Sequence, residues 1–305
     1  MTEKKTFWPT ITAADGDRSL VLDSFVIVIF LDQDRRFDIA PVEHAFEMFL
    51  SGVGRGHIHL YVDFEGDTRQ LPSDPTPIFR DYISRPTERA DVTELRLLDT
   101  DLSKPLFQAQ YVQDPTISAE EQPDHRGVIW FRVSQELFVT RRADVIAFAR
   151  SLTEELPYTY GYASPALSYG ESFSAALPFL RRHPGFDVVD PPTAAWDIGD
   201  GPMGPYWMNF FGPRLAEKLG GIDALRSQLS GDFDVSPCGQ GGVCVTIGKD
   251  PQVGDVNCGD VLPLYREFAA LLQPWLRTPK YVYFTDPGDN GDPDAQEEWH
   301  QRFLR

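Results

Sequence analysis

Acidic and aromatic side chains are the groups in this sequence best suited to recognition chemistry. The acidic candidates fall in two stretches that are far apart along the chain, at Asp197, Asp200, Asp286, Asp289, Asp292 and Asp294. Tyr206 and Trp207 follow the first stretch in the segment Tyr206-Trp-Met-Asn-Phe-Phe. Carboxylates attract cationic surfaces, and Tyr and Trp are frequent interface anchors. We expect most of the aromatic segment in the core. A part left exposed beside these aspartates would form a partner-binding rim.

Paired carboxylates could also serve acid/base catalysis. Asp197 with Asp200, and Asp232 with Asp234, have suitable short spacings. The chain contains 46 Asp and Glu residues, so pairs of this kind arise by chance and say little about a site. The sequence shows neither a GxSxG turn nor a cysteine in a convincing catalytic setting. We therefore predict no catalytic residue.

Two stretches approach metal-binding patterns without completing them. His57 and His59 share one face of an expected strand with Asp63, which could supply two nitrogens and one oxygen. The segment beginning at Asp286 nearly fits a calcium loop, but Gly288 stands at its third position and has no side-chain oxygen. A solvated strand face and a polar turn are the preferred interpretations. We predict no bound metal.

One glycine pattern resembles a cofactor motif. Gly199-Asp-Gly201-Pro-Met-Gly204 matches the GxGxxG dinucleotide fingerprint. The motif requires a preceding strand and a following helix, whereas this stretch follows Pro-Pro-Thr-Ala-Ala-Trp and is followed by Pro205. We interpret it as a turn and predict no cofactor.

Net charge narrows the class of partner. Lys and Arg number 28 against 46 Asp and Glu, which leaves a formal charge of −18 at pH 7. A chain this acidic repels phosphate backbones, which argues against direct nucleic-acid binding and favours a cationic partner. The longest apolar run, Phe25 to Leu31, is far short of the roughly 20 residues that span a membrane. The N-terminus lacks a secretory signal pattern, and three cysteines without CxxC spacing suit a reducing compartment, so we expect a cytoplasmic protein.

Hydrophobic periodicity indicates the elements that must position these residues. Strands are expected at 21–31, 57–64, 92–98, 106–113 and 127–134, and helices at 39–51 and after an N-cap at Thr140. Later elements are a strand from Tyr158, helices at 171–182, 213–219, 222–229 and 262–271, and strands near Phe233, Val243 and 281–284. Short links between successive strands imply antiparallel pairing.

The predicted fold class is therefore α+β, with a largely antiparallel or mixed sheet flanked by helices. We predict one domain over residues 19–284, which could consist of two fused lobes at 19–155 and 156–284. Residues 1–18 and 285–305 are expected to be surface termini. Within the last segment, Trp299, Phe303 and Leu304 are spaced so that a short helix could dock.

Three stretches of the second half carry a resemblance to a known family. They are Leu156-Pro-Tyr-Thr-Tyr-Gly-Tyr-Ala, Gly204-Pro-Tyr-Trp-Met-Asn-Phe-Phe-Gly-Pro-Arg-Leu-Ala-Glu-Lys-Leu-Gly-Gly, and Gly254-Asp-Val-Asn with Leu262-Pro-Leu-Tyr-Arg. In this order, residues 156–275 resemble the type VI secretion immunity family associated with VRR-nuclease toxins. The resemblance implies a cytoplasmic, non-enzymatic protein that binds a basic nuclease toxin and blocks its action. It provides no catalytic or contact residues to transfer.

Two other functional classes remain open at this point. One is a small-molecule hydrolase or transferase with a dispersed active site around His57 and His59. The other is an accessory protein of the secretion system. The charge of −18 fits the immunity interpretation, because an acidic inhibitor complements the basic substrate channel of a nuclease and associates with it faster. The sequence does not indicate the oligomeric state.

Overall fold

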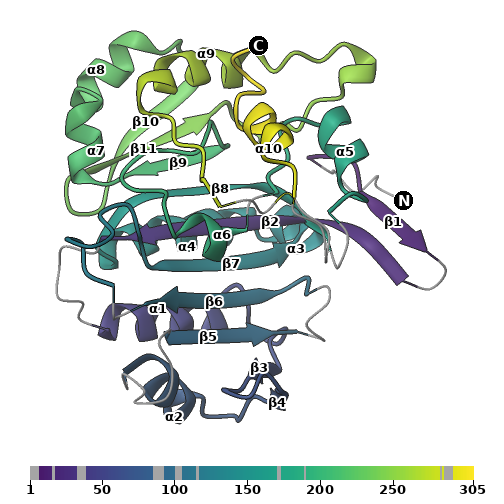
Figure 1. Cartoon of the computed structure of the whole chain (residues 1–305), viewed down its shortest axis with the longest axis vertical. Coiled ribbons are helices and arrows are strands. Elements are labelled where there is room, and N and C mark those ends of the chain that lie inside the picture. Colours follow the sequence, from purple (N-terminus) through teal and green to yellow (C-terminus); the bar gives the residue numbers. More distant parts are fainter. Residues whose placement is uncertain are drawn as a thin grey trace.

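One sheet organises the whole fold. Its strands are β1 (Thr12–Asp15), β2 (Arg18–Leu31), β3 (Leu60–Val62), β4 (Thr68–Gln70), β5 (Thr93–Leu98), β6 (Gln108–Gln113), β7 (Val128–Ser134), β8 (Tyr158–Tyr169), β9 (Met208–Phe211), β10 (Phe233–Cys238) and β11 (Gly242–Ile247). They lie in the order β10-β11-β9-β8-β2-β7-β6-β5-β3-β4, with β1 paired to β2 (Figure 1). All of these named pairings are antiparallel. The computed structural model describes residues 7–15, 18–32, 39–84, 93–99, 105–114, 117–169, 173–188, 190–281, 284 and 291–305.

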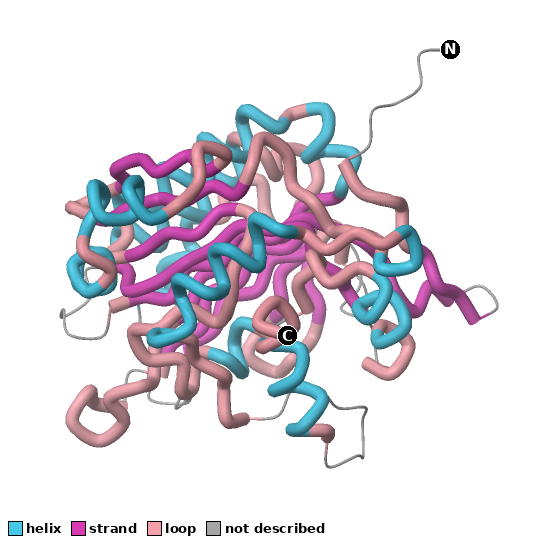
Figure 2. The backbone as a smooth tube through the Cα atoms, turned by 90° about the horizontal axis from the view of Figure 1, so that it is seen from above, coloured by secondary structure: helices cyan, strands magenta, loops and turns pink. Residues whose placement is uncertain are grey.

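Helices lie on both sides of the strands (Figure 2). They are α1 (Ala40–Ser51), α2 (Thr76–Phe79), α3 (Gln135–Thr140), α4 (Arg142–Glu155), α5 (Leu177–Arg182), α6 (Pro191–Ala194), α7 (Pro213–Lys218), α8 (Gly221–Gln228), α9 (Pro263–Leu272) and α10 (Pro293–His300). Short helical segments η1 (Arg80–Ser84), η2 (Val256–Cys258) and η3 (Gln273–Trp275) complete the set. The α+β class and the antiparallel sheet expected from the sequence are confirmed. Among the described residues, no helix has the length and apolar character needed to cross a membrane.

Alternate residues of β2 enter two hydrophobic cores. Phe25 and Ile27 pack in the core that also contains residues of α1, α3 and α4. Val26 and Val28 pack in the opposite core, which contains residues of α7, α8 and α9. This alternation follows from the period of two in a β-strand, and two buried faces explain why the sequence of β2 reads as a continuous apolar run.

Strands β2 and β8 join the two halves of the chain within one sheet. Their pairing extends from Val21 opposite Tyr169 to Leu31 opposite Tyr158. Every residue of β8 except Tyr169 is buried. Residues 19–155 and 156–284 therefore contribute adjacent strands to a common sheet.

Several expected boundaries differ from the structure. The strand expected at 57–64 is only Leu60–Val62, because the preceding residues form turns. Thr140 is not an N-cap: it lies in the last turn of α3, where its Oγ1 donates to Glu136 O at 2.8 Å. Ser134 caps α3 instead by accepting from Leu137 N. The helix expected at 171–182 is described only as α5, and the described positions at 281 and 284 are not in a strand.

Both chain ends contain residues that pack into the cores. Trp8 and Ile11 are buried, and Asp23 on β2 accepts hydrogen bonds from Trp8 Nε1 at 2.9 Å and Ile11 N at 2.8 Å. Near the other end, Trp299 and Phe303 are also buried. The described parts of residues 1–18 and 285–305 therefore include side chains that pack into the cores. The short docking helix expected near the C-terminal end is α10.

Candidate functional site

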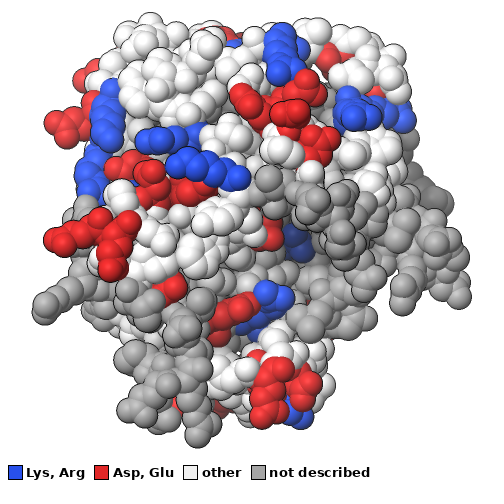
Figure 3. All heavy atoms as spheres, in the orientation of Figure 1, with Lys and Arg blue, Asp and Glu red and all other residues white. Residues whose placement is uncertain are grey.

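Helix α10 presents an acidic outer face. Asp292 caps the helix by accepting a hydrogen bond from Ala295 N at 2.8 Å, and Pro293 is in the first turn. A capping carboxylate followed by proline is a strong helix start. The exposed acidic residues of α10 and its N-cap are Asp292, Asp294, Glu297 and Glu298, which we call the acidic α10 face. In Figure 3, acidic side chains gather where Figure 1 places α10.

A short segment around Lys280 links this helix to Asp197. Asp197 follows α6, and its Oδ2 accepts a hydrogen bond from Lys280 N at 2.6 Å. The side-chain amide of Gln296 on α10 donates to Pro279 O at 2.8 Å and to Tyr281 O at 3.2 Å. Burial raises the pKa of Asp197, although the hydrogen bond from Lys280 opposes this effect. The structure therefore ties Asp197 and the C-terminal acidic helix to the same segment.

Two of the predicted site residues cannot be placed on this surface. Asp286 and Asp289, with the first five positions of the calcium-like loop, lie outside the described residues. Glu297, at the last position of that loop pattern, is in α10 and accepts a hydrogen bond from Gln301 Nε2 at 2.9 Å. Glu297 and Glu298 were expected only as part of a surface terminus and were not among the predicted site residues. The spacing of Asp294, Glu297 and Glu298, at i, i+3 and i+4, was the signal that could have identified them, because it places all three on one face of a helix.

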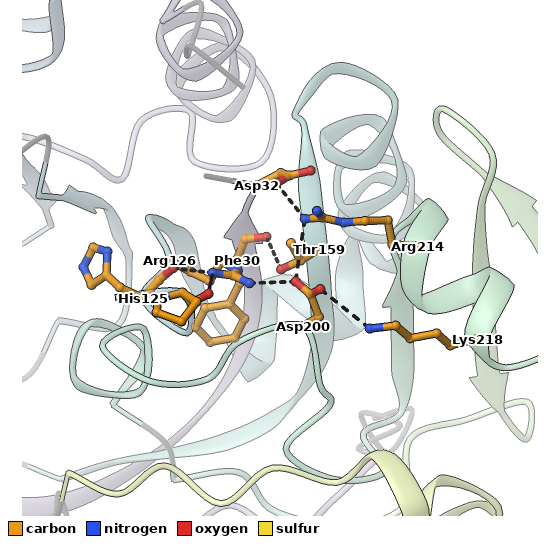
Figure 4. A network of polar contacts seen from close by, with 9 residues as sticks. Phe30, Asp32, His125, Arg126, Thr159, Asp200, Arg214 and Lys218 are labelled. Carbon is orange, nitrogen blue, oxygen red and sulfur yellow. Dashed lines mark hydrogen bonds and ion pairs between the residues drawn. The ribbon is translucent and has the colours of Figure 1, made fainter. Parts of the chain in front are cut away.

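Asp200 belongs to a charged network where β2 ends and β8 begins (Figure 4). Arg126 Nη2 donates to Asp200 Oδ1 at 2.7 Å, and the Arg126 side chain is only 7% exposed. Arg214 Nη2, at the start of α7, lies 2.9 Å from Asp32 Oδ1 and 3.7 Å from Asp200 Oδ1. Lys218 Nζ is 3.8 Å from Asp200 Oδ2. Burial raises the pKa of Asp200, but these cations outweigh it and hold the pKa below its usual value.

The carboxylates of this network pair with cations of the same chain, so the network stabilises the fold and does not form a free acidic surface. Its three cations exceed its two carboxylates, so it has the opposite sign to the whole chain. Arg126 also donates through Nη1 to Pro123 O at 2.6 Å and His125 O at 2.5 Å, which holds the loop before β7. A cavity of about 320 Å³ beside the network is lined in part by Asp32, Asp200 and Arg214. The Asp200 carboxylate already pairs with a buried guanidinium, and breaking such a pair is costly.

The two aromatic residues expected as anchors are buried. Tyr206 and Trp207 are each 1% exposed. Tyr206 stacks on Tyr162 with ring centroids 3.8 Å apart, and Trp207 lies edge-on to Phe25 at 5.9 Å. They immediately precede β9, which lies between β8 and β11, so their side chains point into the cores on the two faces of the sheet. The core interpretation of this segment is correct, and an exposed patch formed by these two rings is wrong.

The histidine pair near β3 does not form a ligand group with Asp63 within the described residues. The His57 ring stacks on Phe107 with centroids 3.9 Å apart. Arg69 Nε donates to Asp63 Oδ2 at 2.7 Å, and this bond is the main cause that lowers the pKa of Asp63. In the described part of the chain, the only close group of three candidate ligands is Asp63, Glu65 and Asp67. Arg69 pairs with Asp67 as well, so it supplies positive charge to that turn.

Two further sequence candidates have structural roles. Gly199 adopts a φ of 58° in a turn, and a Cβ on Gly201 would lie 2.3 Å from Arg277 Cγ. The glycine pattern therefore serves chain packing, and it leads into β9 rather than a helix. Burial raises the pKa of Cys238 and raises that of Cys244 to about 12. Both thiols stay protonated near neutral pH, which makes them poor nucleophiles.

Comparisons with known proteins give two positive findings. The family model described as "TsiV: Type VI immunity for VRR-NUC" matches residues 42–303. The solved structure of Pseudomonas aeruginosa T6SS protein PA0821 resembles the chain with a TM-score of 0.76 and 15% identity, over 94% of this chain and 83% of that chain. At this identity the likeness shows a shared fold, and no match is found among curated proteins. Because the family model spans most of its length, the chain belongs to the TsiV family of type VI immunity for VRR-NUC.

Proposed function

We propose that this protein neutralises a VRR-nuclease toxin by forming a stoichiometric complex with it in the cytoplasm. Membership of the TsiV family, over residues 42–303, is the observation that carries the proposal. The net charge of −18 supports it, because a nuclease must bind the phosphate backbone through cationic groups. Inhibition then requires only that the acidic protein bind where the nucleic acid would, without catalysis.

The proposed contact surface is centred on the acidic α10 face and includes Asp197. Asp292, Asp294, Glu297 and Glu298 project from one helix, which fixes their spacing before the partner arrives. A preorganised acidic surface steers a basic partner and loses little entropy on binding. We leave Asp200 out of this surface because it is compensated by the buried guanidinium of Arg126, whereas Glu298 pairs with Arg305 at 3.0 Å while both side chains stay exposed. Asp286 and Asp289 remain sequence-based candidates.

The test is an inhibition titration. Purified protein would be added to the cognate nuclease in a DNA-cleavage assay, and the complex would be weighed by size-exclusion chromatography with light scattering. We expect activity to fall linearly to an endpoint at a fixed molar ratio, and co-expression to restore growth of cells that produce the toxin. Inhibition that is complete at a small fraction of one equivalent would indicate an enzyme that destroys the toxin. Absence of a complex would also contradict the proposal.

A further inference from the structure

A second feature beside Asp197 is a pocket that combines exposed aromatic surface with carboxylates. The cavity has a volume of about 390 Å³. It lies between the loop before β7, the residues after α6 and the segment that contacts α10. We call it the aromatic–acidic pocket, and its defining residues are Asp124, Trp196, Asp197 and Tyr281. None of these residues belongs to the charged network around Asp200.

The rings of this pocket present an open face. Tyr281 is 55% exposed, so much of its ring is available to a partner. Its centroid lies 6.2 Å from that of the half-buried Trp196, with the planes inclined at 55°. His125 packs edge-on against Trp196 at 5.1 Å. Burial lowers the pKa of His125, so this imidazole adds no positive charge to the pocket at neutral pH.

Two carboxylates give the pocket its charge. Asp124 is held by the bond from Gly199 N to Asp124 O at 2.8 Å, and the positive φ of Gly199 lets the carboxylate approach closely. A Cβ on Gly199 would lie 2.6 Å from Asp124 Oδ1, so only glycine leaves this position free. The charges of Asp124 and Asp197 act on each other. Lys280 is the one cation among the lining residues, so the pocket retains a net negative charge.

We infer that the aromatic–acidic pocket receives an arginine side chain of the toxin. This inference rests on the proposed function. A planar guanidinium stacks on an aromatic face and forms paired hydrogen bonds with a carboxylate, and the pocket offers both partners. Lysine fits less well, because its ammonium is more strongly hydrated and lacks the planar fork. The neighbouring acidic α10 face steers the basic partner, while the pocket provides the short-range contact that holds it.

Two variants with matched controls test the pocket. Tyr281→Leu removes the stacking face, and Asp124→Asn removes one charge without changing shape. Phe64→Leu is the aromatic control, since Phe64 is 58% exposed and lies on the distant β3–β4 hairpin. Asp223→Asn is the charge control on α8. We expect each pocket variant to raise the dissociation rate of the toxin complex about 10-fold, the typical scale for an interface hot spot, and the controls to stay within about 2-fold.

A small probe separates this inference from the proposed function. N-acetyl-arginine methylamide would be titrated into the protein while the Trp196 indole signal is followed by NMR, with the lysine analogue for comparison. We expect saturable shifts with the arginine probe, weaker ones with lysine and none in Tyr281→Leu. If the parent neutralises the toxin but both pocket variants dissociate at the parental rate, the inference is overturned and the proposed function stands. If no nuclease binds, the proposed function fails, and unshifted signals with the arginine probe would overturn the pocket independently.

Discussion

His300 illustrates how single residues join distant parts of this chain. It ends α10, is 3% exposed, and its Nδ1 lies 3.0 Å from Met203 O. A neutral imidazole can donate one hydrogen bond and needs no counter-charge, so it is well suited to a buried contact between distant segments. Burial lowers the pKa of His300 to about 3. The docking of α10 therefore depends on an uncharged histidine.

This burial predicts a defined pH dependence of stability. The folded pKa of His300 lies below the ordinary value of 6.5, so the unfolded state takes up a proton first as the pH falls. The stabilising contribution is complete above pH 6.5 and is lost progressively down to about pH 3. Between pH 7 and pH 5 we expect His300 to account for a loss of about 2 kcal/mol in the free energy of unfolding.

Denaturant unfolding at several pH values measures this contribution. His300→Gln should show a shallower decline of stability between pH 7 and pH 5 than the parent, whatever its absolute stability. His59→Gln, at an exposed position just before β3, is the control for the loss of one histidine. A parental slope in His300→Gln would show that the burial of this imidazole does not control the pH response.

Among the helices and strands, sequence periodicity correctly predicted those with a long apolar pattern. It missed or misplaced those whose ends depend on tertiary contacts. The strand at 21–31 and the helix at 39–51 appear as β2 and α1, since each has a long apolar pattern with clear ends. The helix expected after Thr140 appears as α4, which begins after a backbone change at Arg141 with φ −127° and ψ 35°. Helix α3 was missed, because its six residues are too few to show a clear helical period. Strand β9 was read only as an aromatic segment, because all four of its residues are buried and do not alternate.

The turn between β10 and β11 shows how a tertiary contact constrains one position. Gly239 lies against the end of α4, and a Cβ there would be 1.7 Å from Thr153 O. Gly239→Ala should therefore destabilise the protein by about 3 kcal/mol, because the hairpin must move away from the helix. Gly231→Ala is the matched control, since a Cβ at Gly231 meets nothing within 4 Å. Thermal unfolding of both variants measures the difference, and equal stabilities would mean that the hairpin does not depend on this close approach.

For the molecule as a whole, the acidic composition predicts a cationic partner but does not show which acidic residues could contact it. Asp197 precedes the start of α10 by 96 residues, and the bonds of Lys280 and Gln296 show that both contact the same segment. Conversely, Asp200 is three residues from Asp197 yet is committed to Arg126. Charge composition therefore yields only a prediction about the class of partner. The available surface depends on internal pairing and burial, which become visible only in the fold.

The position of the negative charge on the molecule should determine how fast the toxin associates. The Debye screening length falls to about 8 Å at 0.15 M salt. The association rate of a −18 chain with a basic toxin should therefore fall steeply as the salt concentration rises, while the dissociation rate changes less. If the acidic α10 face steers the partner, Asp294→Asn with Glu297→Gln and Glu298→Gln should lower the association rate and its salt dependence. Exposed charges contribute little to stability, so this variant should remain folded.

The matched control neutralises three exposed residues on and near α7 and α8, Glu217, Asp223 and Asp232. Surface binding kinetics of the two triple variants decide the matter: equal slowing would mean that only the total charge matters. Parental rates in both, or salt-independent association of the parent, would restrict the charge to a role in solubility.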